Sequence, residues 1–161
     1  MSDYLHPDKE IAKHGGKLPH WQQGEVMQFV TFRLGDSLPY AKLRKWKEER
    51  ETWLSFHPRP WSPEKEKEYH QRFTKEFEKW LDEGAGSCLL QDSENRSHLE
   101  FVLNYDQGKG ATHHAWVIMP NHVHLLVTPH EPIERLMRRW KGISARNIGK
   151  GSIWQKAYHD T

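Results

Sequence analysis

The sequence contains a single cysteine, Cys88, in 161 residues, so an internal disulfide cannot form. A chain without disulfides suits a reducing compartment, and we predict a cytoplasmic location. The sequence also lacks a long apolar run, and its first 17 residues are polar. These two features argue against a membrane-spanning segment and against a secretory signal peptide.

Apolar residues are scarce as well, at 35% of the chain, which is low for a globular protein. Eight tryptophans partly compensate, because each one buries a large apolar area. We therefore expect a thin core with long polar helices outside it. The length fits one domain, or a small domain with an inserted helical element.

The net charge is only +2, so overall charge does not indicate a nucleic-acid partner. The residues from Glu131 to Thr161 differ, because seven basic residues stand against three acidic ones, a local charge of +4. A basic segment of this kind is consistent with phosphate contacts, and equally with a solvated helix face.

The spacing of apolar residues predicts alternating strands and helices. Strands are predicted over 26–33, 114–119, 122–129 and 153–159, and helices over 38–56, 62–83, 93–105 and 131–148. This order favours an α+β fold of ferredoxin-like type, with one mostly antiparallel sheet, helices on one face and an inserted helical segment. Residues 1–24 are expected to be a flexible lead-in, and residues 25–161 the domain.

Two histidines, His122 and His124, begin the strand that follows the tight turn at 120–121. Residues two apart in a strand point to the same face, so the two imidazoles are expected to project together, with Val123 and Leu125 in the core. Two adjacent imidazoles can bind one metal ion. The alternative is that they are ordinary surface residues, since the chain holds twelve histidines.

The segment from Trp116 to Val127 reads WVIMPNHVHLLV, and it resembles the His-hydrophobic-His block of the IS200-like, REP-associated tyrosine transposases. Shorter pieces match the same family in the same order. They are Leu18–Trp21, Phe29–Leu34, Trp80–Asp82, Gly86–Cys88, Trp140–Lys141 and Ile153–Gln155. The resemblance covers roughly residues 17–160.

The resemblance implies a protein that cuts and rejoins single-stranded or hairpin DNA during transposition. In the family pattern, His122, His124 and a third polar ligand bind Mg²⁺ or Mn²⁺, and the metal polarises the scissile phosphate. A tyrosine attacks the phosphorus and becomes joined to the 5′ end of the cut strand. The candidates for phosphate contacts are Arg135, Arg138, Arg139 and Arg146.

The sequence departs from the family at its C-terminal end. The family's nucleophilic tyrosine and third ligand lie on a helix after the last strand, whereas this sequence ends at Thr161. We therefore expect that helix to be missing and activity to be reduced or lost, with Tyr158 as the nearest substitute nucleophile. A sheet surface left uncovered predicts lower stability or self-association, such as a homodimer.

Other functions stay open at this point. A nucleotide hydrolase of the histidine-triad class would need a third histidine where the sequence has Leu126. A non-catalytic DNA-binding remnant of a transposase would keep the hairpin without the cleavage activity. In a purely structural role, His122 and His124 would bind no ligand.

Overall fold

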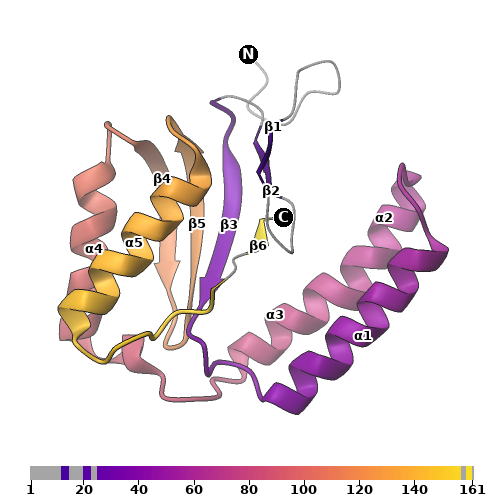
Figure 1. Cartoon of the computed structure of the whole chain (residues 1–161), viewed down its shortest axis with the longest axis horizontal. Coiled ribbons are helices and arrows are strands. Elements are labelled where there is room, and N and C mark those ends of the chain that lie inside the picture. The colour runs from indigo at the N-terminus through magenta and orange to yellow at the C-terminus, as the bar shows by residue number, and fades with distance from the viewer. Residues whose placement is uncertain (1–11, 15–19, 23–24, 157–158, 161) are drawn as a thin grey trace. The chain divides into compact units, whose positions relative to one another are not determined.

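Figure 1 shows the computed structural model of the chain, which describes residues 12–14, 20–22, 25–156 and 159–160. The chain divides into two compact units. The larger unit contains residues 1–35 and 89–161, and residues 36–88 form the second unit, which is inserted in the sequence of the first. Among the helices so described, none is long and apolar enough to cross a membrane.

The larger unit is built on a four-stranded sheet with the strand order β4-β5-β3-β6. Its strands are β3 (Gln28–Arg33), β4 (Ala111–Ile118), β5 (His122–Pro129) and β6 (His159–Asp160). All neighbouring strands are antiparallel. With a helix before β4 and another after β5, this order is the ferredoxin-like one, which confirms the predicted α+β fold. A separate two-stranded sheet pairs β1 (Ala12–His14) with β2 (His20–Gln22).

Helices α4 (Ser93–Asp106) and α5 (Ile133–Ile148) cover one face of the four-stranded sheet (Figure 1). A 3₁₀ turn (Leu89–Gln91) precedes α4. Asp92 caps α4, because its side chain accepts hydrogen bonds from the backbone N–H groups of the next turn at 2.9 and 3.0 Å. α5 ends at Gly149, whose φ of 73° is one that glycine adopts without strain.

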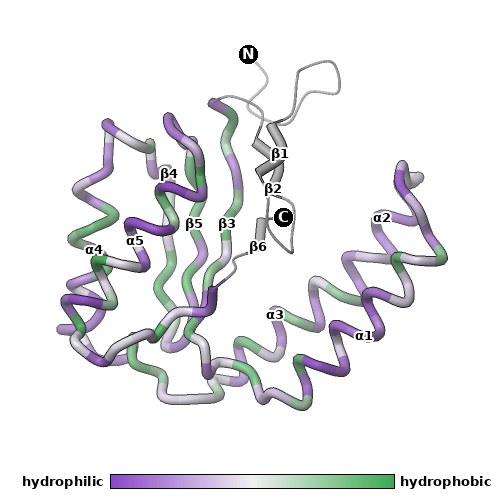
Figure 2. The backbone as a smooth tube through the Cα atoms, in the orientation of Figure 1, coloured by the Kyte–Doolittle hydropathy of each residue, from purple (hydrophilic) through white to green (hydrophobic). Residues whose placement is uncertain are grey.

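The core lies between these helices and the sheet. Hydrophobic and hydrophilic residues are mixed along β3 and β5 (Figure 2), and residues two apart in each strand point to the same face, toward the core. The buried side chains include Val30, Phe32, Leu99, Leu103, Val123, Leu125, Val127, Ile133, Leu136 and Trp140. The predicted inward positions of Val123 and Leu125 are therefore confirmed.

A β-bulge interrupts β4 between His113 and Ala115 and shifts its register against β5. His114 and Ala115 are both exposed, which breaks the usual alternation of a strand. As a result Trp116, after the bulge, packs on the same core as the residues before it. The β4–β5 turn is closed by a hydrogen bond from Met119 N to His122 O of 2.8 Å.

Residues 36–88 form helices with a core of their own. The elements are α1 (Tyr40–Phe56), α2 (Pro63–Tyr69), a π-helical turn (His70–Thr74) and α3 (Lys75–Asp82). The continuous helix predicted over 62–83 is thus interrupted by a π turn, because an apolar spacing of three and four does not reveal a locally wider turn. The core side chains are Leu38, Trp46, Trp53, Phe73, Phe77 and Leu81.

The two ends of this inserted unit meet. Ser87 N donates a hydrogen bond of 2.8 Å to Asp36 Oδ2. A Cβ at Gly86 would lie only 2.4 Å from Asp36 O, and the φ of Gly86 is 90°, so this close approach requires glycine. The first and last residues of the inserted unit therefore lie side by side.

The prediction of a strand over 153–159 is wrong for residues 153–156. Residues 153–156 contribute only an isolated bridge between Trp154 and Leu34, and a strand begins at His159. Two side-chain hydrogen bonds also hold this segment: Trp154 Nε1 donates to Ser144 Oγ at 2.9 Å, and Lys141 Nζ donates to Gln155 O at 2.7 Å. The segment is thus held by α5 as much as by the sheet.

Candidate metal and nucleic-acid site

His122 and His124 lie on the face of β5 opposite the core, next to each other. Their ring centroids are 4.8 Å apart and the planes are nearly perpendicular, at 85°. His122 is 1% exposed, whereas His124 is half-buried. Across the β3–β5 register, His122 is opposite Arg33 and His124 is opposite Thr31. The predicted projection of both rings to one face agrees with this geometry, and metal binding by them stays a prediction.

The ring of His122 is oriented by the residue before it. Its Nδ1 lies 2.8 Å from the side-chain oxygen of Asn121. An amide oxygen can only accept, so Nδ1 carries the proton and the lone pair of the neutral ring is on Nε2. Asn121 is itself buried and fixed, because its backbone oxygen accepts a hydrogen bond of 2.9 Å from Leu34 N.

The ring of His124 is oriented from the neighbouring strand. Its Nδ1 shares a hydrogen bond of 2.8 Å with Thr31 Oγ1. Phe29, two residues earlier on β3, stacks on the imidazole with centroids 5.3 Å apart and planes 23° apart. Phe29 is 36% exposed, so this ring offers part of an aromatic face to solvent beside the histidine pair.

Two cations lie where β3 ends. Arg33 is buried, and its Nη1 donates to Leu34 O at 3.2 Å. Burial lowers the pKa of Arg33 to about 10. Burial, and then the positive charge of Arg33, lower the pKa of Lys141 to about 8. Both side chains are mainly protonated at neutral pH, so positive charge gathers at the end of β3, where Arg33 is opposite His122.

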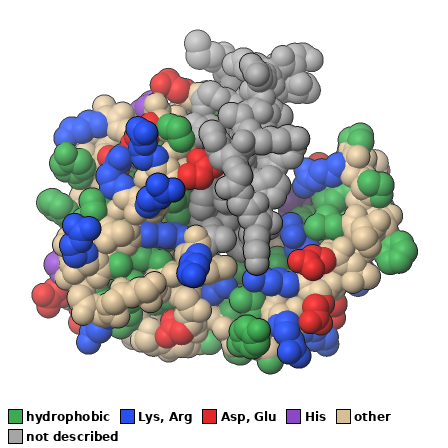
Figure 3. Space-filling view, viewed as in Figure 1, with side chains coloured by type: hydrophobic (Ala, Val, Ile, Leu, Met, Phe, Trp, Pro, Cys, Tyr) green, Lys and Arg blue, Asp and Glu red, His purple; other side chains and the backbone are tan. Residues whose placement is uncertain are grey.

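The four arginines predicted to contact phosphates all lie on α5. That helix packs on the core face, so the structure does not bring these arginines to the histidine pair. Figure 3 shows Lys and Arg side chains gathered over α5 on the viewed surface. Arg135, Arg138 and Arg146 are exposed there. Their contact with DNA stays a prediction, and it would involve a different face of the molecule.

Arg139 has a structural role in this arrangement. Its guanidinium donates to both carboxylate oxygens of buried Asp106, at 3.0 and 2.8 Å, and also to Glu131. Trp140 Nε1 donates to the same Asp106 at 2.7 Å. The hydrogen bonds to Asp106 raise the pKa of Arg139. Nothing local in the sequence indicated this network, because Asp106 is 33 residues from Arg139.

Two parts of the predicted site have no structural description. Tyr158, the predicted substitute nucleophile, lies outside the described residues. Within the described ranges no group of three His, Cys, Asp or Glu side chains is placed to bind one metal ion, so the third ligand is not identified. Arg33, Thr31 and Asn121 are the neighbours that the sequence alone did not assign to the site. The strand register and the turn reveal them.

The fold and the site together define an α+β domain of ferredoxin-like type with two imidazoles on its open sheet face. Residues 87–160 match the family described as Transposase IS200 like. The resemblance to IS200-like transposases is thus confirmed for the segment that contains α4, the hairpin and α5.

A solved structure of a REP-associated tyrosine transposase bound to a REP hairpin is also similar to this chain. The two share 16% sequence identity with a TM-score of 0.43. The match covers 100% of this chain and 61% of that one, so this chain spans about three fifths of its length. No curated protein matches the chain.

Proposed function

We propose that the open sheet face binds a divalent cation together with a phosphate of single-stranded or hairpin DNA, as in transposition by strand cleavage and rejoining. The observation that carries this proposal is the orientation of the histidine pair. Each Nδ1 is engaged, by Asn121 or by Thr31, and the rings are 4.8 Å apart between centroids. Metal-binding histidines commonly donate their second N–H to such a partner, and both the Asn121 oxygen and the Thr31 hydroxyl can accept it.

The donor set fits Mn²⁺ better than Mg²⁺. Imidazole nitrogen suits transition metals, whereas Mg²⁺ prefers an all-oxygen shell. His122 and His124 would hold the ion through Nε2, and DNA phosphate or water oxygens would complete its coordination. When bound, the ion supplies Lewis-acid polarisation of the phosphate. Mn²⁺ is therefore the ion to test first.

The protein's own residues position the phosphate and stabilise its charge. Arg33, which is opposite His122 in the strand register, brings a positive charge to the end of β3, where a phosphate gathers negative charge as it is attacked. Phe29 offers an aromatic face on which an unpaired base can stack next to the cut. This arrangement favours a single strand over a paired duplex, whose bases are already stacked.

The cleavage step transfers the phosphate to a tyrosine, for which Tyr158 stays the candidate of this chain. The tyrosine oxygen loses its proton to water and forms a bond to phosphorus, and the bond from phosphorus to the 3′ oxygen breaks. The departing 3′ oxygen takes up a proton and becomes a hydroxyl. The phosphodiester is conserved as a phosphotyrosine, so the strand can be rejoined without an external energy source.

Mn²⁺ binding tests this proposal directly, by the electron paramagnetic resonance of free Mn²⁺ and by thermal unfolding with and without the ion. We expect Mn²⁺ to raise the melting temperature of the wild type, and we expect His122→Ala and His124→Ala to abolish that shift. His98→Ala, in α4, is the control that should retain it. Equal shifts in all four proteins would overturn the metal site.

A second assay separates DNA binding from cleavage. A labelled hairpin DNA with a single-stranded flank is mixed with the protein and Mn²⁺, and a covalent adduct is sought on a denaturing gel. An adduct that disappears in Tyr158→Phe supports the complete proposal. Tight binding without an adduct would instead favour a non-catalytic DNA-binding protein.

A further inference from the structure

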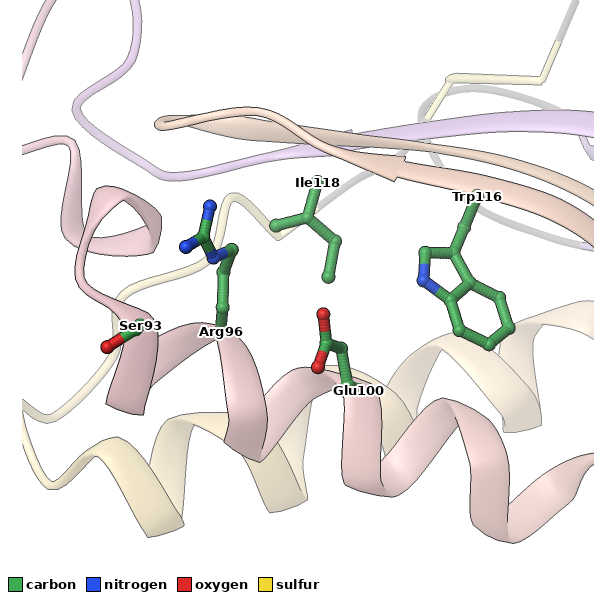
Figure 4. A pocket seen from close by; sticks show the side chains of 5 residues that line it. All are labelled: Ser93, Arg96, Glu100, Trp116 and Ile118. Carbon is green, nitrogen blue, oxygen red and sulfur yellow. The ribbon is translucent and has the colours of Figure 1, made fainter.

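A cavity of about 380 Å³ lies between α4 and β4, on the side of the sheet opposite the histidine pair. Figure 4 shows Arg96 and Glu100 rising from α4 toward Ile118 and Trp116, which descend from β4. Ser93, at the start of α4, completes the lining. The space is thus bounded by an indole ring and an aliphatic side chain on one side and by two opposite charges on the other.

The two charged side chains are available to a ligand. Arg96 and Glu100 are one helical turn apart, a spacing that permits an ion pair. Within the described part of the chain, however, neither side chain forms an ion pair or a side-chain hydrogen bond. Figure 4 shows the Glu100 carboxylate directed between Ile118 and Trp116, and the Arg96 guanidinium beside Ile118. A fork of donors beside Ile118 and a pair of acceptors between Ile118 and Trp116 therefore border the same space.

We propose that this cavity binds an unpaired guanine base of the DNA strand, an inference that rests on the proposed DNA partner. Guanine carries two adjacent acceptors, O6 and N7, on one edge, which match a guanidinium fork. Its N1–H and N2–H groups on the other edge match a carboxylate. The flat ring stacks on Trp116, in the way that single-stranded nucleic acids are commonly bound.

The cavity is placed to take a base close to the histidine pair. Trp116 and Ile118 flank Val117 on β4, and Val117 is opposite His124 in the β4–β5 register. Adjacent residues of a strand point to opposite faces, so the cavity and His124 lie on the two sides of the sheet. β4 is the end strand of the sheet order, and Val117 is exposed there. The path from His124 to this edge is one strand spacing, about 4.8 Å.

A DNA strand that bends around β4 would therefore place a phosphate at the histidines and a neighbouring base in the cavity. This geometry separates two tasks: the open face handles the reacting phosphate, and the cavity reads the identity of a base. Base reading by the cavity would make cleavage depend on sequence, because stacking on Phe29 beside the histidine pair accepts any base.

The test uses the full chain and four labelled hairpin DNAs whose single-stranded flanks are oligo-dT with one varied position. Fluorescence anisotropy is measured in buffer without divalent metal, so that the histidine site does not contribute. At one flank position we expect guanine to bind about tenfold tighter than adenine, cytosine or thymine, the discrimination typical of bidentate base contacts. Equal affinities at every position would overturn the proposal.

Variants then assign the preference to the cavity. Glu100→Gln and Arg96→Gln are each expected to reduce the guanine preference to less than about threefold, since each removes one bidentate contact. Glu94→Gln, an exposed residue on the same helix, is the matched control and should keep it. A preference that survives in both cavity variants would place base reading elsewhere and overturn the proposal.

GMP provides an independent probe that needs no DNA. Titration of ¹⁵N-labelled protein with GMP should shift the indole N–H resonance of Trp116, assigned with Trp116→Phe, whereas CMP and TMP should not. If GMP binds while Mn²⁺ binding fails at His122 and His124, the cavity proposal stands and the metal proposal falls. If Mn²⁺ binds and GMP does not shift the Trp116 resonance, the metal proposal stands and the cavity proposal falls.

Discussion

Single hydrogen bonds fix the nitrogen that each histidine presents. His122 and His124 are equivalent in the sequence pattern, yet one ring is held by the residue before it and the other by a residue across the sheet. Asn121 can only accept at its oxygen, so it selects one tautomer of His122, whereas the Thr31 hydroxyl can donate or accept. The two histidines are therefore oriented by different partners, so substitutions at Asn121 and at Thr31 can test separately what each histidine contributes to metal binding.

Asn121→Ala is expected to weaken Mn²⁺ binding about 10- to 100-fold, as loss of an orienting partner commonly does. Asn121→Asp keeps an acceptor at the same position and should retain binding. The ring ¹⁵N shifts of His122 in metal-free protein provide the second readout. They should report a proton on Nδ1 in the wild type and a mixture of tautomers in Asn121→Ala. Unchanged shifts in Asn121→Ala would remove Asn121 from this role.

The buried ring of His113 makes stability depend on pH. Burial lowers its pKa from the ordinary value of 6.5, the negative charge of Asp106 opposes this, and His114 adds to it. The folded protein therefore binds this proton less readily than the unfolded chain does. The stability that neutral His113 contributes is present above pH 6.5 and is lost as the pH falls below that value toward the folded pKa.

We expect the free energy of unfolding in urea to fall between pH 7.5 and 5.0, and to fall less in His113→Phe, which keeps a ring but cannot be protonated. The slopes of the two curves are compared, so an offset from altered packing does not matter. Parallel curves for the two proteins would show that His113 is not the responsible group.

At the scale of the elements, α5 is attached to α4 by a buried charge. Asp106 is 2% exposed and accepts hydrogen bonds from both Arg139 and Trp140. Removing one partner of such a group leaves the other charge poorly compensated. The basic face of α5 thus contains one arginine that stabilises the fold and three exposed ones.

Asp106→Ala is therefore expected to lower the free energy of unfolding by about 3 kcal/mol, within the range measured for breaking buried ion pairs. Glu94→Ala, on the exposed side of the same helix, should change it by less than about 1 kcal/mol. Urea denaturation of the three proteins provides the measurement. A loss for Asp106→Ala no larger than that of the control would contradict the structural role of this network.

Elements were easier to predict from the sequence than the contacts between them. The strands, the hairpin turn and the helices follow from apolar spacing and from turn residues, because these signals are local. The pairing of Arg139 with Asp106 joins residues 33 positions apart, and no local pattern marks it. The bulge at 113–115 was not predictable either, although it decides that Trp116 faces α4. The cavity that Arg96 and Glu100 line depends on this orientation of Trp116.

At the scale of the whole molecule, the chain consists of two units with separate cores. Residues 36–88 bury their own aromatic cluster, and the larger unit buries the sheet against α4 and α5. Both candidate sites lie in the larger unit. Damage to the inserted unit should therefore leave the chemistry of the histidine pair intact.

Phe73→Ala and Phe32→Ala form a reciprocal pair of tests, because each truncates a fully buried phenylalanine in one core. Each should cost about 3–5 kcal/mol in its own unit. Hydrogen exchange read by mass spectrometry should accelerate in residues 36–88 for Phe73→Ala and in residues 111–129 for Phe32→Ala. Mn²⁺ affinity should persist only in Phe73→Ala. Equal acceleration across the chain in either variant would argue for one cooperative unit.

The extra residue in β4 also determines which side chains of the hairpin point to the core and which point to solvent. Because one added residue has already reversed the order of faces along this strand, a single further insertion or deletion near His114 would exchange inside and outside for every residue on one side of it. Ala111 would turn to solvent and Thr112 would enter the core. Insertions or deletions near His114 are therefore tolerated only when they add or remove two residues. A related chain without the bulge would need its tryptophan one position away from that of Trp116 to keep the indole on the core face.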